Sequence, residues 1–212
     1  MNQISRLLCA LLLALLATLA PLGSAMAIEE APFKTITADG PFAIREYEPY
    51  LVAETYVEGE FDTVGNEGFR RLFRYISGDN AKSQSIAMTA PVEQAAASEK
   101  IAMTAPVEQQ KSGERWRVAF VLPASYSLET APKPLDPRVT VVAMPARRMA
   151  AVRYSGTWSQ SRYDENLAAL AKFISDRGLS PEGEPVFARY DPPFMPWFLR
   201  RNEILVPVRR TP

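Results

Sequence analysis

The chain has 212 residues and balances 24 lysines and arginines against 24 aspartates and glutamates, with no histidine and a single cysteine. The absence of histidine excludes imidazole as a catalytic base or metal ligand. No basic block stands out, which argues against broad nucleic-acid binding, and the length is within reach of one compact α+β domain.

The first 27 residues have the pattern of a secretory signal. Arg6 supplies a positive start, an apolar run extends from Leu7 to Ala20, and Ala25-Met26-Ala27 is a small-x-small cleavage site. The competing interpretation is an uncleaved anchor. Thr18 and Pro21 interrupt the run, however, and it falls short of the ~20 residues that span a bilayer. We therefore expect residues 1–27 to be removed.

Cleavage would leave residues 28–212 as a single periplasmic or secreted domain without a stable membrane span. Cys9 lies inside the signal, so the mature chain would have no disulfide, no thiolate metal site and no cysteine nucleophile. Losing Arg6 leaves 23 basic against 24 acidic residues, a net charge of −1.

The first unit of the mature chain is predicted to be strand followed by helix. An apolar strand region runs from Phe42 to Val57, and a helical stripe follows it, closed by Gly78. The stripe consists of Phe61, Val64, Phe69, Leu72, Phe73 and Ile76.

An identical run of nine residues then occurs twice. Ile86 to Gln94 recurs unchanged as Ile101 to Gln109, fifteen residues later. If extended, each copy places alternate apolar residues on one face, so the two copies are predicted to pair as a hairpin around the turn at 95–98. Pro91 and Pro106 would confine them to edges or strand ends.

Residues 115–122 alternate between two sets of side chains, as expected for a strand with one buried face. The proline-rich stretch from Glu129 to Pro137 is predicted to be a loop that crosses from one half of the domain to the other.

The second half repeats the plan of the first. Strand residues Val139 to Tyr154 lead to a helical stripe closed by Gly178. This stripe consists of Tyr163, Leu167, Leu170, Ala171 and Ile174. Pairing Gly59 with Gly156, and Ile76 with Ile174, gives offsets of 97 and 98. Such constancy favours a duplication, with halves at about 36–123 and 138–208, over coincidence between two ordinary strand–helix units.

The segment from Tyr190 to Ile204 carries three prolines, three large aromatic residues after the tyrosine, and Arg200-Arg201. Prolines 192, 193 and 196 exclude a continuous helix, so we expect a shaped loop feeding a strand from about Asn202 to Val208. A rigid apolar loop with a cationic end suits a flat hydrophobic ligand that carries acidic groups.

Several motifs together give the chain a resemblance to the SOUL/heme-binding protein family. They are Ile-Ala-Met-Thr-Ala-Pro-Val at 86–92 and 101–107, Phe-Val-Leu-Pro at 120–123, Ser-Gly-Thr-Trp at 155–158, and the segment 190–204. The resemblance covers roughly Ile36 to Val208. It implies a distorted antiparallel β-barrel built from two pseudo-symmetric strand–helix–strand repeats, with two main helices, which agrees with the repeat found in the residues.

The resemblance also implies a ligand. Family members bind heme and other tetrapyrroles, and some ligate the iron through histidine, which this chain lacks. Other members hold the porphyrin in an apolar groove with basic residues at the propionates, and only that mode carries over here. The expected function is a carrier, buffer or scavenger of a tetrapyrrole or another small hydrophobic ligand; no protein partner is indicated.

Candidate contacts come first from the helix at 61–76. Phe69 and Phe73 are interpreted as core side chains rather than ligand contacts, because an apolar stripe normally faces the core. Beside them, Arg70, Arg71 and Arg74 would form a cationic rim if the groove lies next to them, and otherwise only solvate the helix.

Candidate iron ligands are two methionines and two tyrosines. Met88 and Met103 lie in the duplicated motif and could offer sulfur to iron, although core filling is the commoner use of methionine. Tyr154 and Tyr190 could ligate ferric iron, although such residues usually pack with the hydroxyl hydrogen bonded.

The C-terminal segment has three interpretations. Its apolar residues could close over a ligand while Arg200 or Arg201 meets an acidic group; those residues are Phe194, Met195, Trp197 and Phe198. Alternatively they plug the barrel while Arg201 pairs with Glu203 or Asp191, which we favour for the arginines. Insertion into a membrane interface ranks last.

Catalysis has little support, because no nucleophile elbow, phosphate loop or metal-ligand cluster occurs. A buried carboxylate could act as a base, but the alternation of Glu54, Tyr56 and Glu58 predicts a solvated strand face. The strand–helix plan also resembles the effector-binding domains of the GyrI-like group, some of which are hydrolases. Acidic residues in the groove would favour that alternative, and arginines at its rim would favour a tetrapyrrole.

Overall fold

The computed structural model describes residues 28–82 and 97–210. The expected signal segment, Met88 and the first copy of the duplicated run lie outside the described residues, so their assignments stay predictions. The elements, in chain order, are β1 (Phe33–Asp39), β2 (Phe42–Tyr47), β3 (Tyr50–Val57), α2 (Phe61–Ile76), β4 (Asn80–Ala81), β5 (Val107–Ser112), β6 (Arg115–Val121), β7 (Lys133–Pro134), β8 (Thr140–Met144), β9 (Arg147–Tyr154), α3 (Gln160–Asp176), β10 (Leu179–Pro181), β11 (Val186–Arg189), the 3₁₀ turn η1 (Trp197–Leu199) and β12 (Asn202–Arg210).

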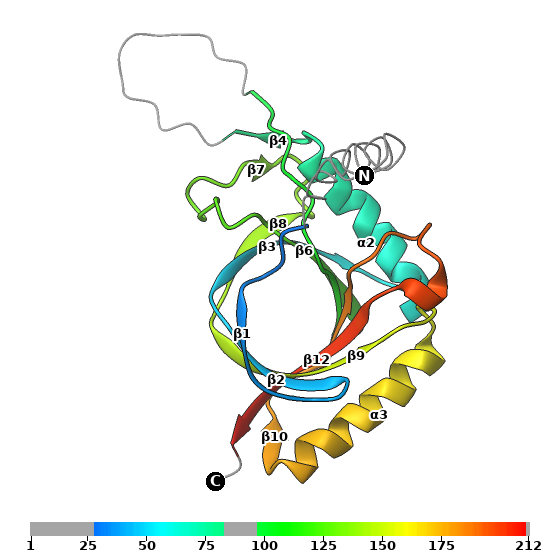
Figure 1. Cartoon of the computed structure of the whole chain (residues 1–212). Coiled ribbons are helices and arrows are strands. Elements are labelled where there is room, and N and C mark those ends of the chain that lie inside the picture. Colours follow the sequence, from blue (N-terminus) through cyan, green and yellow to red (C-terminus); the bar gives the residue numbers. More distant parts are fainter. Residues whose placement is uncertain (1–27, 83–96, 211–212) are drawn as a thin grey trace, which may run out of the picture.

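The main sheet is antiparallel and strongly curled. Its strand order is β1-β2-β9-β12-β11-β5-β6-β3-β8, with β10 beside β12. Both helices lie on the outer side of this curl (Figure 1). The α+β class with two main helices is thus confirmed. The barrel is an open one, because within the described residues no pairing joins β1 to β8 at the two ends of the sheet.

The strand order reads symmetrically about its centre. From the β5–β11 pair outward, β6 and β3 on one side match β12 and β9 on the other, and each helix follows the corresponding strand, β3 or β9. Gly59 and Gly156 precede the helices with φ of 134° and 139°, in the region that glycine tolerates best. The duplicated plan predicted from the sequence is therefore present in the fold.

Helix α2 packs very closely on the sheet. Asp62 in the first turn and Arg74 in the last complement the helix dipole. At Gly68, a Cβ atom would lie 2.5 Å from Cβ of Val118 on β6, so only glycine allows this approach. The core beneath α2 includes Leu72 and Tyr75 with Val118 and Phe120.

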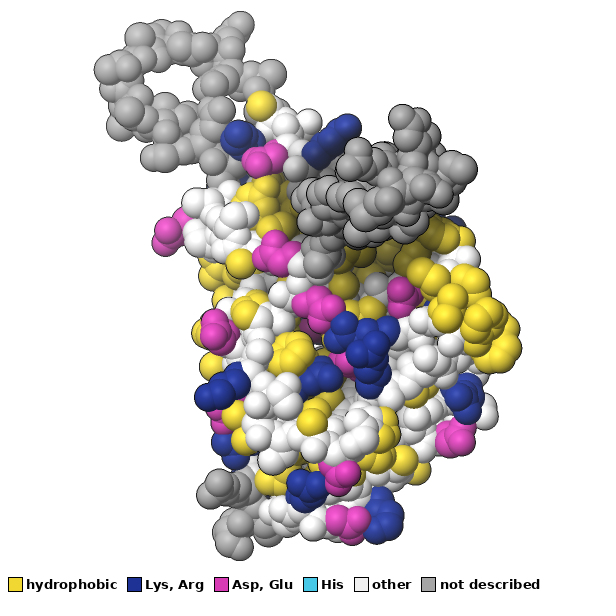
Figure 2. All heavy atoms as spheres, viewed as in Figure 1, with side chains coloured by type: hydrophobic (Ala, Val, Ile, Leu, Met, Phe, Trp, Pro, Cys, Tyr) yellow, Lys and Arg dark blue, Asp and Glu magenta, His cyan; other side chains and the backbone are white. Residues whose placement is uncertain are grey.

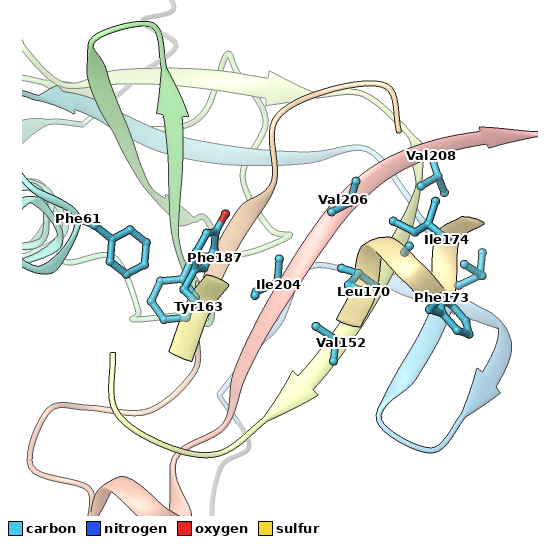
Figure 3. Close-up of a cluster of buried hydrophobic side chains, with 12 residues drawn as sticks. Phe61, Val152, Tyr163, Leu170, Phe173, Ile174, Phe187, Ile204, Val206 and Val208 are labelled. Carbon is cyan, nitrogen blue, oxygen red and sulfur yellow. The ribbon is translucent and has the colours of Figure 1, made fainter. Parts of the chain in front are cut away.

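Helix α3 covers the other half of the sheet. Leu170 and Ile174 pack on Val152 of β9 and Ile204 of β12. Figure 3 shows that Phe61 from the start of α2 meets Tyr163 and Phe187 near the start of α3, which brings the N-terminal ends of the two helices together.

Four details of the sequence interpretation were wrong. Phe73 is 46% exposed rather than a core residue, and Ala171 is exposed while Phe173 takes its place in the core. Strand β6 is buried on both faces from Arg117 to Val121, because one face meets α2 and the other lines the inside of the curl. The predicted hairpin does not form through β5, since Val107–Gln109 pair with β6 on one side and β11 on the other.

Candidate functional site

A cavity of about 360 Å³ opens beside α2, outside the curl of the sheet. Three segments enclose it: the N-terminal half of α2, the stretch leading into β5, and the loop that follows β11. The lining residues are predominantly apolar: Ile28, Gly65, Asn66, Phe69, Met103, Thr104, Ala105, Val107, Trp158, Arg189, Tyr190, Asp191, Pro192, Pro193 and Phe194.

Gly65 creates space for the one arginine in this lining. Arg189 ends β11, and its side chain points out of the curl toward α2. A Cβ at position 65 would lie 2.5 Å from Nη2 and 2.7 Å from Nη1 of Arg189. The helix backbone and the guanidinium therefore touch because residue 65 has no side chain.

The environment of Arg189 is unusual for a cation. Its guanidinium lies over the indole of Trp158 at 4.9 Å, and its Nε is buried without a hydrogen-bond partner. Among the described residues no carboxylate forms an ion pair with it. Desolvation lowers the pKa of Arg189 to about 10, so the group stays charged at neutral pH without a counter-charge.

Aromatic rings continue from the cavity along α2. Phe69 lines the cavity and stacks on Phe73 with centroids 5.8 Å apart. Met103 and Phe194 at the mouth are exposed by 42% and 85%. Figure 2 shows apolar side chains gathered over the loop after β11, at the right of the view. The mouth of the cavity is thus apolar, and a cation lies deeper.

The loop after β11 is held by its two arginines. The Arg201 amide donates to Oδ2 of Asp191 at 2.6 Å, and its guanidinium pairs with Glu30 and Glu203 at 2.6 and 3.0 Å. Arg200 donates to the carbonyl oxygens of Met195 and Pro193 and lies over Trp158 at 4.5 Å. Both arginines fix the shape of the loop, as the favoured interpretation of the sequence proposed for them.

Tyr190 lines the cavity, but its hydroxyl group is hydrogen bonded to an acidic residue. Its hydroxyl donates to Oε2 of Glu203 at 3.0 Å, and Arg201 lies 3.6 Å from its ring centroid. Burial, and then the charge of Glu203, raise the pKa of Tyr190 well above its ordinary value. A phenolate at this position is therefore disfavoured. Tyr154 is absent from the cavity lining, and its buried hydroxyl has no partner within the described ranges.

The structure gathers some of the predicted contact residues and separates others. Phe69, Met103, Tyr190 and Phe194 line the cavity, with Phe73 stacked next to it. The remaining described candidates are absent from the lining: Arg70, Arg71, Arg74, Tyr154, Met195, Trp197, Phe198, Arg200 and Arg201. Sequence reasoning missed Gly65, Trp158 and Arg189. The usable signal was Arg189 itself, an arginine that ends a short apolar strand directly before Tyr190-Asp-Pro-Pro.

Carboxylates gather elsewhere, inside the curl of the sheet. Glu54 is buried and bonds to Arg117, which also pairs with Glu108 at 3.0 Å. Glu203, fully buried, binds Arg45 at 2.6 Å as well as Arg201. The predicted solvated face at Glu54 was therefore wrong, because β3 turns this face toward the interior. These acids are neutralised by arginines.

The described part of the chain has neither a cluster of metal ligands nor a membrane-spanning helix. In residues 28–82 and 97–210, no group of three or more acidic or cysteine side chains could hold a metal ion. No helix in the same ranges has the length and apolar character to cross a membrane.

Residues 28–207 match the model of a protein family that is described as SOUL heme-binding protein. Heme-binding protein 1 of Xenopus laevis is 27% identical over 164 residues, which cover 77% of this chain and 81% of that protein. Heme-binding protein 2 of Homo sapiens is 26% identical over 160 residues, which cover 73% and 74%.

Solved structures share the fold at much lower identity. The crystal structure of the EcmrR C-terminal domain superposes with a TM-score of 0.56 and 12% identity, over 80% of this chain and 98% of that one. The crystal structure of a hydrolase from Listeria innocua gives 0.53 and 12%, over 82% and 94%. Identity this low carries the architecture and nothing about chemistry.

Proposed function

This chain belongs to the SOUL heme-binding protein family, and on that basis we propose that it binds a tetrapyrrole in the cavity beside α2, without an iron ligand from histidine. The observation that carries the proposal is the cavity itself. Its lining is apolar and aromatic, and its one arginine has no counter-charge among the described residues. A tetrapyrrole offers both matching features, a flat apolar ring and acidic side chains.

The residues fit the ligand by type. Phe69, Met103 and Phe194 would contact the ring, and Arg189 would meet an acid. A cavity of about 360 Å³ is near the lower end of ligand pockets, so part of the macrocycle would stay outside, against Phe73. Bound heme would supply a redox-active iron, and the chain would supply shelter and orientation.

We propose that no side chain of the protein ligates the iron. Tyr190 gives its hydroxyl hydrogen bond to Glu203 and has a raised pKa. Met103, exposed at the mouth, is the one described methionine in the lining and remains the alternative ligand. Binding through apolar contact and charge implies that iron is dispensable for affinity.

Replacing an aromatic residue of the lining tests the location. Phe69→Ser should weaken hemin binding by about tenfold, because a large side chain that covers the ring contributes on the order of 1–3 kcal/mol. The affinity is measured by titration at the Soret band. Leu135→Ser, which changes an equally apolar but exposed residue away from the cavity, is the matched control and should bind as the unmodified protein does. Equal loss in both variants, or in neither, would contradict this location.

A hydrolase, or a binder of apolar cations, is the alternative that the strand–helix plan of the sequence suggested. The arrangement of the carboxylates inside the curl of the sheet argues against both functions. Glu54, Glu108 and Glu203 each bond to an arginine, so none is free to act as a base or to receive a cation. This arrangement supports a binding protein without chemistry of its own.

We also propose a cellular compartment for the protein. Residues 1–27 have the sequence pattern of a secretory signal. We therefore place ligand binding in the periplasm or outside the cell, where transport, buffering and scavenging all fit.

A further inference from the structure

We propose that the tip of the loop after β11, residues 192–199, is a membrane-docking site that inserts its aromatic side chains into the surface of an anionic phospholipid bilayer. The tip carries four large apolar side chains that are exposed by 85%, 59%, 58% and 62%: Phe194, Trp197, Phe198 and Leu199. Three of these four residues are absent from the cavity lining, so the inference does not depend on the tetrapyrrole proposal.

The exposed apolar residues of the tip belong to a larger patch. Phe194 meets Met103 at the mouth of the cavity, and Phe73 continues the exposed surface along α2. The loop lies outside the curl of the sheet, and apolar side chains gather over it (Figures 1 and 2). Single exposed hydrophobic residues are normal, but a contiguous patch marks an interaction site. Their exposure also excludes the interpretation that these aromatics plug the barrel.

The carbonyl groups of the tip are hydrogen bonded within the protein. Those of Pro192 and Pro196 accept from the amides of Met195 and Leu199, and that of Trp197 accepts from the amides of Gly156 and Arg200. Those of Pro193 and Met195 accept from the Arg200 guanidinium at 2.6 and 2.8 Å. The three prolines have no amide hydrogen that needs a partner. A protein partner can supply missing hydrogen bonds but lipid tails cannot, so this arrangement favours a bilayer.

The tip is also held in one shape before it meets a partner. Arg200 bridges two of its carbonyl groups, and the bond from the Gly156 amide to the Trp197 carbonyl, at 3.1 Å, ties it to the turn before α3. The rings of Trp197 and Phe198 meet edge to face with centroids 5.6 Å apart. Little conformational entropy is therefore lost when these rings insert.

Arginines beside the patch favour anionic headgroups. Arg70 is exposed on α2, three positions before Phe73, and Arg200 lies behind the tip, over Trp158. In residues 28–82 and 97–210, no carboxylate forms an ion pair with either arginine. Tryptophan next to arginine is a composition typical of membrane interfaces, where the ring inserts and the cation stays at the headgroups. A second copy docked on the same patch would instead bring like charges together.

Fluorescence of Trp197 in the presence of vesicles tests the docking site on the full chain. The vesicles contain equal parts of phosphatidylcholine and phosphatidylglycerol, with brominated acyl chains as quenchers. Trp197 should be quenched as lipid is added. A Trp197→Phe variant identifies the part of the signal that comes from the loop, and so separates it from any binding by the apolar run at residues 7–20.

Two double variants locate the binding surface. Phe198→Ser with Leu199→Ser should raise the lipid concentration at half-maximal quenching by roughly 10- to 100-fold, because two large apolar side chains no longer enter the interface. Leu128→Ser with Leu135→Ser is the matched control, since these leucines are exposed by 57% and 61% away from the tip. It should bind vesicles as the unmodified protein does. Far-ultraviolet circular dichroism of each variant confirms that it is folded.

Absence of quenching at Trp197, or an equal effect of the two double variants, would overturn the inference. Equal affinity for vesicles of phosphatidylcholine alone would overturn it as well, because the arginines would then contribute nothing. A dimer in sedimentation equilibrium without lipid that is lost in the Phe198→Ser, Leu199→Ser variant would assign the patch to a second copy instead. Hemin titration of the same variant reads the tetrapyrrole proposal separately, since neither residue lines the cavity.

Discussion

Two arginines near the loop after β11 differ in whether acidic residues lie close enough to form ion pairs with them. Arg201 lies within reach of Glu30 and Glu203 and fixes the loop. Arg189 lies against Gly65 and Trp158, and no carboxylate in the described part of the chain forms an ion pair with it. Arg201 therefore stabilises the loop, and we propose that Arg189 binds a ligand. The sequence places them twelve positions apart and gives no hint of this difference.

Removing the charge of Glu203 should destabilise the protein strongly. Glu203→Gln leaves Arg45 with a buried, uncompensated charge, and such a loss costs about 3–5 kcal/mol of unfolding free energy. Urea unfolding at pH 7 measures it. Glu114→Gln, at an exposed glutamate, should change the free energy of unfolding by no more than about 0.5 kcal/mol.

The same residue should make stability depend on pH. Burial alone would raise the pKa of Glu203, but Arg45 and Arg201 bring it below its ordinary value of 4.5. A lowered pKa means that the stabilisation is complete above about pH 4.5 and is lost as pH falls through the lower folded value. The unmodified protein should therefore lose stability in that acid range, and Glu203→Gln should show a smaller loss. Parallel curves for the two proteins would contradict this account.

At the scale of elements, periodicity predicted both helices because each has one face on the sheet. It misplaced residues at the borders of those faces. Phe73 is exposed because α2 extends its apolar surface past the sheet toward the cavity. Period-two reasoning also failed for β6, since a strand covered by a helix outside and by side chains within the curl is buried on both faces. Only the tertiary arrangement supplies that second burial.

Two glycines of α2 allow a matched experiment. Gly65→Ala should displace the flexible end of Arg189 and weaken binding of mesoporphyrin IX, with little change in stability, since alanine favours helix by about 1 kcal/mol. Gly68→Ala should instead destabilise the fold, because its Cβ would collide with Cβ of Val118, an atom next to the backbone. Thermal unfolding and porphyrin titration of both variants separate the two effects. Equal behaviour of the two would contradict the assigned roles.

At the scale of the molecule, the fold is symmetric but the cavity is not. The offset of 98 that aligns Leu72 with Leu170 also aligns Gly65 with Tyr163. Tyr163 is buried against Phe61 and Phe187, so the space beside α3 is filled where the space beside α2 is open. Among the described residues the cavity is therefore open beside α2 and filled at the equivalent position beside α3, and we propose a binding site beside α2.

The two helices and the repeat were predictable from residue spacing, because each helix has its own periodic pattern and the two patterns recur at a constant offset. The antiparallel barrel was instead an expectation from the family resemblance. The site was predictable only in part. Met103, Tyr190 and Phe194 were named in advance from their motifs, whereas Phe69 was interpreted as a core residue. Their convergence with Arg189 and Trp158 depends on the path of the loop after β11 across α2. Contacts between segments this distant leave no periodic signal in the sequence.

The most direct test of the central claim is a parallel titration of the purified protein with hemin and metal-free protoporphyrin IX, following tryptophan fluorescence and the Soret band. We predict saturable binding of both at one per chain with similar dissociation constants, because apolar contact and Arg189 would hold the ring without an iron ligand. Binding of hemin alone would contradict the account and point to ligation by Met103 or a tyrosine. Binding of neither would exclude a tetrapyrrole as the ligand.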